Sequence, residues 1–207
     1  MHYKLTEEII KLSVSRDWNN AKLEWKFEYA YQSEELETCL CGHYPIKNIC
    51  VITNTKNRTS TEVGNCCINK FLGIEEANKI FTSINRIKED LSKSMSIEVL
   101  EYLFQKKVIT EFEYEFYADI IKKRKLSEKQ QLLKTKINEK LLIFTSYENS
   151  SIQSKIDSVL RWAESHKWFD TAFIISLRST YERKGMLSEK QLTALNNIIS
   201  KNKIEGL

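Results

Sequence analysis

All five cysteines of the chain lie within residues 36–73 instead of being distributed along its 207 residues. They are Cys39, Cys41, Cys50, Cys66 and Cys67, and one of the three histidines, His43, lies among them. Thiolate and imidazole groups are ligands that zinc prefers in proteins. The charged, amphipathic first 18 residues do not have the pattern of a secretory signal, which favours a reducing compartment. The cluster therefore predicts a bound Zn2+ ion rather than disulfides.

The spacing of the cysteines ranks them as ligands. Cys39 and Cys41, with Gly42 directly after them, have the pattern of a tight metal-binding knuckle. The glycine lets the backbone turn and direct its N–H groups at sulfur. Neighbouring side chains diverge, so we expect only one of Cys66 and Cys67 to bind the ion, and we favour Cys67.

The fourth ligand is less well defined by the sequence. We favour Cys50, although it lies in an apolar segment where a buried thiol is the alternative interpretation. His43 is the second candidate, with an exposed polar residue as its alternative, and Cys66 is the third.

The sequence contains no motif of a catalytic centre. It has no H-E-x-x-H metal-hydrolase motif, no zinc-deaminase motif, no glycine-rich phosphate loop and no nucleophile elbow. A catalytic zinc ion would also need an open coordination position and an acid or base beside it. We therefore predict a structural zinc ion in a protein that is not an enzyme.

Residues 39–71, CLCGHYPIKNICVITN…VGNCCINKF, resemble a zinc-binding segment of small proteins from phages and other mobile elements. In that family a CxCGH start is followed by an Ile/Val-rich strand ending in Asn, then by VG, a cysteine and a basic-aromatic ending. The resemblance covers about a sixth of the chain. It implies the ligands Cys39, Cys41, Cys50 and Cys67, and an origin in a mobile element.

The periodicity of apolar residues predicts a mainly α-helical chain with a small β module at the cysteines. We predict helices over residues 5–14, 17–35 and 75–93, strands over 48–54 and 59–63, and turns at 55–58 and 64–65. Asp17 is the expected N-cap of the second helix. A knuckle, a hairpin and a second cysteine turn together have the layout of a zinc ribbon.

An internal repeat follows, because residues 126–130, LSEKQ, recur unchanged at 187–191. Each copy is predicted to form three helices, over 96–107, 111–124 and 128–143, and over 151–166, 170–183 and 189–201. Capping boxes are expected at Ser127 with Gln130, at Ser188 with Gln191 and at Thr110 with Glu113, and a C-cap at Gly185. The predicted domains are residues 1–73, 74–148 and 149–207.

The second copy also resembles a segment near the ends of many phage and bacterial proteins linked to DNA or RNA metabolism. The shared pattern runs from Phe173 through Ser176-Leu177, Tyr181 and Gly185 to Gln191. This resemblance implies a connection with nucleic acid without assigning a role to any residue.

Charge gives limited support to nucleic-acid binding. Residues 151–207 carry nine basic and six acidic side chains, whereas the rest of the chain is nearly balanced. The strongest basic run, residues 122–125, is expected at a helix C-terminus, where offsetting the macrodipole is the alternative role. The candidate phosphate contacts are Lys122, Lys123, Arg124, Lys125, Lys129, Arg183, Lys184 and Lys190. Trp162 and Trp168, on either side of residues 165–167, are predicted core aromatics, with a recognition surface as the alternative.

These observations favour a non-catalytic zinc-binding accessory protein that binds nucleic acid or a nucleoprotein complex. The near-neutral charge makes single strands or RNA better targets than bare duplex. The alternative is a protein-interaction module that inhibits or redirects a host enzyme or defence complex, with a host or phage protein as partner. No apolar run approaches the roughly 18 residues of a membrane helix, so we expect a cytoplasmic protein, in the host cytosol if phage-encoded, and allow for a homo-oligomer.

Overall fold

A computed structural model describes residues 3–73, 76–184 and 187–204, apart from the side chains of residues 76 and 182–184. The chain divides into two compact units, Met1–Glu89 and Asp90–Leu207. Within the described residues it is mainly helical, with one small antiparallel sheet, which confirms the predicted fold class at that level. Of the helices described, none has both the length and the apolar character needed to cross a membrane.

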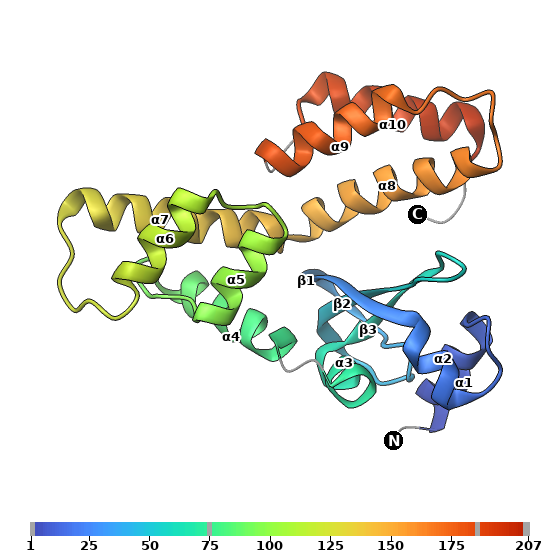
Figure 1. The fold of residues 1–207 in the computed structure, drawn as a ribbon, viewed down its shortest axis with the longest axis horizontal. Coiled ribbons are helices and arrows are strands. Elements are labelled where there is room, and N and C mark those ends of the chain that lie inside the picture. The colour runs from blue at the N-terminus through green and yellow to red at the C-terminus, as the bar shows by residue number, and fades with distance from the viewer. Residues whose placement is uncertain (1–2, 74–75, 185–186, 205–207) are drawn as a thin grey trace. The chain divides into compact units, whose positions relative to one another are not determined.

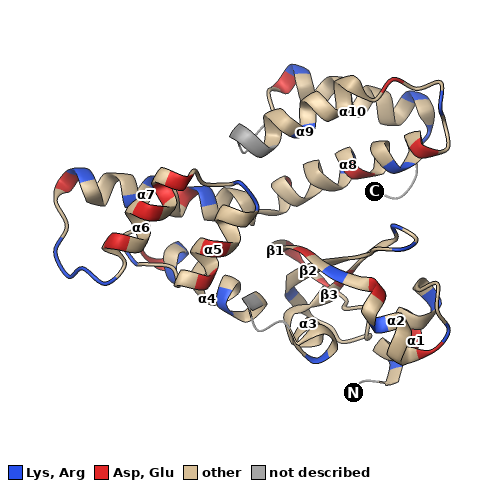
Figure 2. Ribbon diagram, viewed as in Figure 1, with Lys and Arg blue, Asp and Glu red and all other residues tan. Residues whose placement is uncertain are grey.

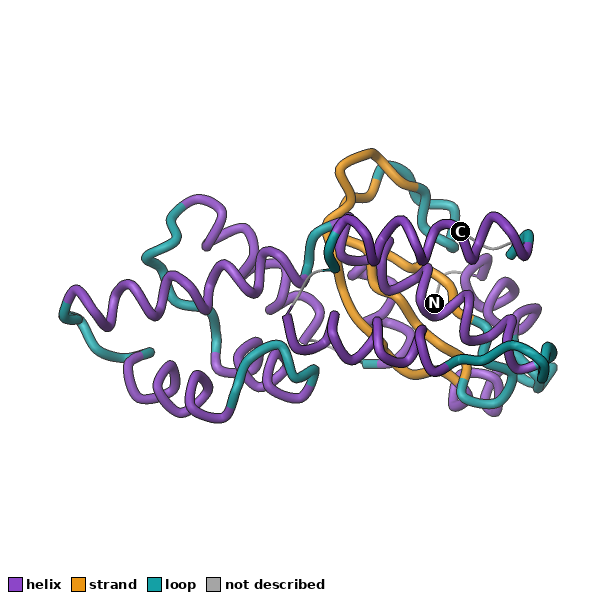
Figure 3. Tube along the Cα trace, turned by 90° about the horizontal axis from the view of Figure 1, so that it is seen from above, coloured by secondary structure: helices purple, strands orange, loops and turns teal. Residues whose placement is uncertain are grey.

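The N-terminal unit is a three-stranded antiparallel sheet with helices before and after it (Figure 1). Its elements are α1 (Tyr3–Leu12), α2 (Trp18–Ala21), a 3-10 turn (Lys22–Glu24), β1 (Trp25–Glu37), β2 (Ile46–Asn54), β3 (Ser60–Gly64), α3 (Asn65–Leu72) and α4 (Glu76–Glu89). The strand order is β1-β2-β3, and Figure 3 shows the strands side by side in orange. Helix α3 packs against β2 and β3, and α4 packs against β1 and α3.

The predicted helix over residues 17–35 is wrong beyond its first turns. Asp17 does cap α2, accepting a hydrogen bond from the Asn20 N–H, but β1 begins at Trp25. Residues 25, 27, 29 and 31 are all aromatic, and this period-two pattern of residues with high β propensity is typical of a strand. Pairing with the apolar strand β2 then determines the structure.

The β-hairpin after the knuckle is confirmed, since β2 and β3 pair with Cys50 opposite Val63. The predicted tight turn at the second cysteine pair is wrong. Gly64 is the N-cap of helix α3, and the two cysteines lie in the first turn of that helix. Cys67, Ile68 and Phe71 share a buried helical face, which is a period of 3.6 residues rather than a turn signal. A zinc-ribbon layout with two knuckles is therefore not what the backbone forms.

The C-terminal unit consists of helices and loops. Its elements are α5 (Ile97–Gln105), α6 (Glu111–Ile120), α7 (Glu128–Phe144), α8 (Tyr147–Glu164), α9 (Ala172–Lys184) and α10 (Glu189–Asn202). Each predicted helix of the two copies is present, and α6 ends at Ile120, earlier than expected. Capping boxes are present at Thr110, Ser127 and Ser188, as predicted. The C-cap expected at Gly185 lies outside the described residues.

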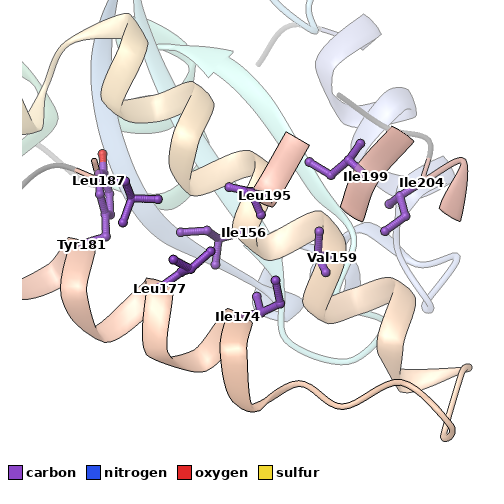
Figure 4. Close-up of a cluster of buried hydrophobic side chains, with 9 residues drawn as sticks. All are labelled: Ile156, Val159, Ile174, Leu177, Tyr181, Leu187, Leu195, Ile199 and Ile204. Carbon is purple, nitrogen blue, oxygen red and sulfur yellow. The ribbon is translucent and has the colours of Figure 1, made fainter. Parts of the chain in front are cut away.

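The last three helices enclose a continuous apolar core. Helix α8 packs against both α9 and α10. Figure 4 shows the buried side chains that meet between them: Ile156, Val159, Ile174, Leu177, Tyr181, Leu187, Leu195, Ile199 and Ile204. Leu187, directly before the Ser188 cap, is buried in this core, as expected for a residue that fastens the start of α10.

A buried polar network holds residues 90–95 against α7. The Asn138 side chain is fully buried, and its amide donates to the carbonyls of Leu91 and Lys93, at 2.8 Å each. Its oxygen accepts from the Tyr117 hydroxyl at 2.6 Å, and that hydroxyl accepts from the Met95 N–H at 3.1 Å. These bonds satisfy groups that would be costly to bury alone.

Candidate metal centre

Three cysteine side chains converge in the N-terminal unit. The Sγ atoms of Cys39, Cys41 and Cys67 all lie within 4.8 Å of one another, and all three residues are buried. Cys39 and Cys41 come from the loop between β1 and β2, and Cys67 comes from the first turn of α3. The Cys39 and Cys67 sulfurs are 3.6 Å apart, which is hydrogen-bond distance for a thiol and not a disulfide. Three soft donors in one buried place could hold a thiophilic metal ion.

The loop that carries the first two cysteines is a tight turn around Gly42. The Cys39 N–H donates to the His43 carbonyl at 2.9 Å, and the Gly42 N–H donates to the Cys39 carbonyl at 2.7 Å. Gly42 has a φ of 84°, a conformation that L-residues with side chains rarely adopt. An added Cβ at this position would lie only 2.6 Å from the Lys4 Nζ of α1. The predicted glycine knuckle is thus present, with the Lys4 ammonium beside its backbone.

Backbone N–H groups and the start of a helix provide a favourable environment for thiolates. The Gly64 N–H donates to the Cys39 Sγ at 3.2 Å, where β3 ends and α3 begins. Cys67 follows in the first turn of α3, where the unpaired N–H groups of a helix favour negative charge. This arrangement resembles the way outer N–H groups orient and stabilise metal-bound sulfur.

Cys39 and Cys67 titrate as a pair. The hydrogen bond from the Cys67 thiol holds the pKa of Cys39 well below its ordinary value, and the Gly64 N–H adds to this effect. The same bond, together with burial, raises the pKa of Cys67. Ionising the second thiol would place two negative charges in one buried group. A bound cation would remove that penalty, so binding of a metal ion here would release thiol protons.

The structure does not bring the other three candidate ligands into this group of sulfurs. Cys50 is fully buried on β2, paired with Ala30 of β1 and Val63 of β3, and burial raises the pKa of its thiol. Cys66 and His43 are exposed. Of the four predicted ligands, three are therefore together, and the fourth, Cys50, occupies a position that the strand pairing fixes.

The basic run at residues 122–125 lies in the loop between α6 and α7, not at a helix C-terminus as predicted, because α6 ends at Ile120. All four side chains are exposed, and Lys123 pairs with Asp119 at 2.6 Å. Figure 2 shows this blue loop beside the acidic helix α6, which lowers its attraction for phosphate. Lys129 and Lys190 are exposed in the first turns of α7 and α10, and the side chains of Arg183 and Lys184 lie outside the described residues.

Comparisons with known proteins found no match: no family model fits the sequence, and no curated protein or solved structure is significantly similar to it. The resemblance to phage and mobile-element proteins consequently stays a hypothesis.

Proposed function

We propose that the chain is a non-catalytic accessory protein whose N-terminal unit is held together by a zinc ion and whose helical unit binds nucleic acid. The observation that carries the metal part is the convergence of the Cys39, Cys41 and Cys67 sulfurs within 4.8 Å in a buried site. A structural role fits their places in the fold. One ion would join the loop after β1 to the start of α3, two segments about 25 residues apart in sequence.

Zinc is the ion that this donor set suits best among common cellular metals. Thiolates select zinc, Cu(I) and iron–sulfur clusters over magnesium or calcium, and zinc adopts a tetrahedral geometry that three cysteines nearly complete. The fourth ligand would come from the knuckle more readily than from the sheet. His43 is exposed two residues beyond Cys41, whereas moving Cys50 would break the pairing of the central strand.

Substitution of the two adjacent cysteines tests the site with a matched control. The purified protein should contain about one zinc ion per chain, as a structural site does. Cys67→Ser should lose the ion and lower the melting temperature, whereas Cys66→Ser, at the exposed neighbouring position, should change neither. Equal zinc content in wild type and Cys67→Ser would contradict the proposed site.

The spectrum of Co2+ bound in place of zinc identifies the fourth ligand. Thiolate-to-cobalt absorption reports the number of sulfurs, so Cys50→Ala should leave the spectrum unchanged if the histidine completes the site. His43→Ala should then shift it. If Cys50→Ala shifts the spectrum and His43→Ala does not, Cys50 is the fourth ligand.

Nucleic-acid binding is supported by the exposed basic loop and by the adjacent Lys129. Because phosphate contacts release counterions, binding should be saturable and should weaken steeply with salt. The test is a titration of labelled single-stranded DNA, duplex DNA and RNA across a salt series. Replacing residues 122–125 with glutamine should weaken binding. A control variant with the same loss of charge replaces the exposed Lys47, Lys70, Lys107 and Lys136.

A protein-interaction module is the second candidate, favoured by exposed apolar side chains on the helical unit. Phe112 of α6 is 66% exposed and stacks on Phe116, and Leu132 of α7 is 58% exposed. If the protein binds none of the three polymers at low salt, the nucleic-acid proposal fails and this second function takes its place. In that case Phe112→Ala should weaken partner binding, and replacement of residues 122–125 should not.

A further inference from the structure

A cluster of aromatic rings lies at one end of the C-terminal helices, and neither the metal centre nor the basic loop involves it. It is formed by Trp162 in the last turn of α8 and by His166, Trp168 and Phe169 in the loop between α8 and α9; we call these four residues the aromatic tip. The rings of Trp162 and His166 are stacked, with centroids 4.0 Å apart. Trp168 stands perpendicular to Trp162 at 5.7 Å and to Phe169 at 6.1 Å.

The neighbours of Trp168 keep this cluster in place. The His166 Nδ1 lies 2.8 Å from the Trp162 carbonyl, and the Phe169 N–H donates to the His166 carbonyl at 2.9 Å. Trp162 and Phe169 also pack against the buried core of the last three helices. Trp168 itself is 71% exposed. Its ring is therefore presented to solvent on a supported loop, and ordering it on binding would cost little conformational entropy.

Basic residues lie in the segments that form and adjoin the aromatic tip. Arg161 and Lys167 flank it in sequence, and Lys201 and Lys203 lie at the end of α10, which Figure 1 shows beside the end of α8. Within residues 161–170 and 200–203, the four basic side chains outnumber the two acidic ones, Glu164 and Asp170. An exposed aromatic ring among cations is the combination that single-stranded nucleic-acid sites use, where bases stack on rings and cations contact phosphates.

We propose that Trp168 is a stacking platform for one base of a single-stranded nucleic acid, with Lys167 and Lys203 as contacts to the adjacent phosphates. This inference rests on the nucleic-acid part of the proposed function and assigns it a site. A single strand is the expected ligand because its bases can be turned outward, whereas those of a duplex are stacked on one another. Trp168 differs from an ordinary exposed aromatic residue because its ring makes edge-to-face contacts with Trp162, His166 and Phe169, and because basic residues lie in the adjoining segments.

The test compares Trp168 with an equally exposed aromatic residue on another helix. Binding of the zinc-loaded, full-length protein to labelled oligo(dT) and oligo(U) is measured by fluorescence anisotropy. Trp168→Ala should weaken binding roughly ten- to a hundredfold, as loss of one base–aromatic stack does. Trp168→Phe should weaken it less, because it keeps an aromatic face. Phe112→Ala, which truncates a ring that is 66% exposed, should leave binding unchanged.

A second readout tests the phosphate contact. Lys167→Gln should make the dependence of log affinity on log salt concentration shallower by about 0.7 for a single strand. The site is overturned if Trp168→Ala binds as wild type does, if Trp168→Phe loses as much as Trp168→Ala, or if Phe112→Ala loses as much as either. Melting curves of each variant show whether the fold is retained.

The outcomes separate this inference from the function on which it rests. If the wild-type protein binds neither oligonucleotide at low salt, nucleic-acid binding itself fails, and the stacking site fails with it. If wild type binds and only replacement of residues 122–125 weakens binding, the function stands and the Trp168 site is overturned.

Discussion

Replacing Asn138 with leucine should strongly destabilise the C-terminal unit, although the substitution nearly preserves side-chain size. Asn138 lies at the centre of the network that holds residues 90–95, and its side chain is completely buried. Leucine would leave the carbonyls of Leu91 and Lys93 without the amide donor and the Tyr117 hydroxyl without its acceptor.

The expected loss follows from the number of groups left unpaired. The buried Tyr117 hydroxyl loses its acceptor at a cost of about 1–3 kcal/mol, and each of the two part-buried bonds to the carbonyls contributes about 0.5–1.5 kcal/mol, so the sum is roughly 2–6 kcal/mol. The gain from burying leucine instead of an amide offsets only about 1–2 kcal/mol of this. A net loss of about 1–4 kcal/mol is a large fraction of the 5–15 kcal/mol that stabilises a typical domain.

Urea unfolding followed by circular dichroism measures this loss, with Asn197→Leu on the exposed face of α10 as the control. The control should stay within about 0.5 kcal/mol of wild type. Tyr117→Phe should cost about 1–3 kcal/mol, mainly because the Met95 N–H loses its acceptor. The double variant with Asn138→Leu should lose less than the sum of the two, since both remove the same bond. A loss below about 1 kcal/mol for Asn138→Leu would refute the network as the anchor of residues 90–95.

Three further predictions concern single side chains. Hydrogen bonds, the largest contribution coming from Asn54, lower the pKa of Glu24 to about 2 from its ordinary 4.5. In melting curves, wild type should therefore be more stable than Glu24→Gln by its full margin above pH 4.5, and this margin should disappear as the pH falls toward 2. Gly42→Ala should weaken Co2+ binding in a competition titration, because φ is 84° and Lys4 occupies the space of a Cβ; unchanged affinity would contradict this. Ser188→Ala should cost about 1 kcal/mol in urea unfolding by removing the cap of α10, and Ser200→Ala on its exposed face should not.

Sequence periodicity was sufficient for the helical unit because its signals are local. The capping boxes at Ser127 and Ser188 mark helix starts through residues only three positions apart, and they are present as predicted. The prediction for residues 17–35 failed because charged residues obscured the local signal of a strand, the alternating aromatic residues at 25, 27, 29 and 31. The strand is also stabilised by pairing with β2, which lies about 20 residues further along the chain and which no local pattern reveals.

The residues of the candidate metal centre also divide into those that a local sequence pattern identifies and those whose positions depend on the fold. The Gly42 knuckle is local, and the sequence identified it together with Cys39 and Cys41. From the sequence, Cys67 was favoured over the adjacent Cys66. The reason was that neighbouring side chains diverge, and the helix that positions Cys67 was not predicted. Cys50 was placed among the ligands from the clustering of the cysteines and from the resemblance to the mobile-element segment. Only the strand register, with Ala30 and Val63 on either side, shows that its side chain occupies a fixed place in the sheet.

Helices α7 and α10 show why a sequence repeat is difficult to recognise beyond its capping boxes. At a separation of 61 residues they bury corresponding positions, Lys134 with Leu195 and Asn138 with Ile199. The chemistry at these positions is opposite, because Leu195 and Ile199 complete an apolar core while Lys134 donates to the Ser92 carbonyl at 2.6 Å. Lys134 and Asn138 of α7 donate to the carbonyls of residues 91–93, whereas the corresponding residues of α10 pack in the apolar core. The buried positions of α7 and α10 therefore correspond even where the residue types differ. The polar residues Lys134 and Asn138 of α7 differ from their counterparts because they bind the segment of residues 91–93.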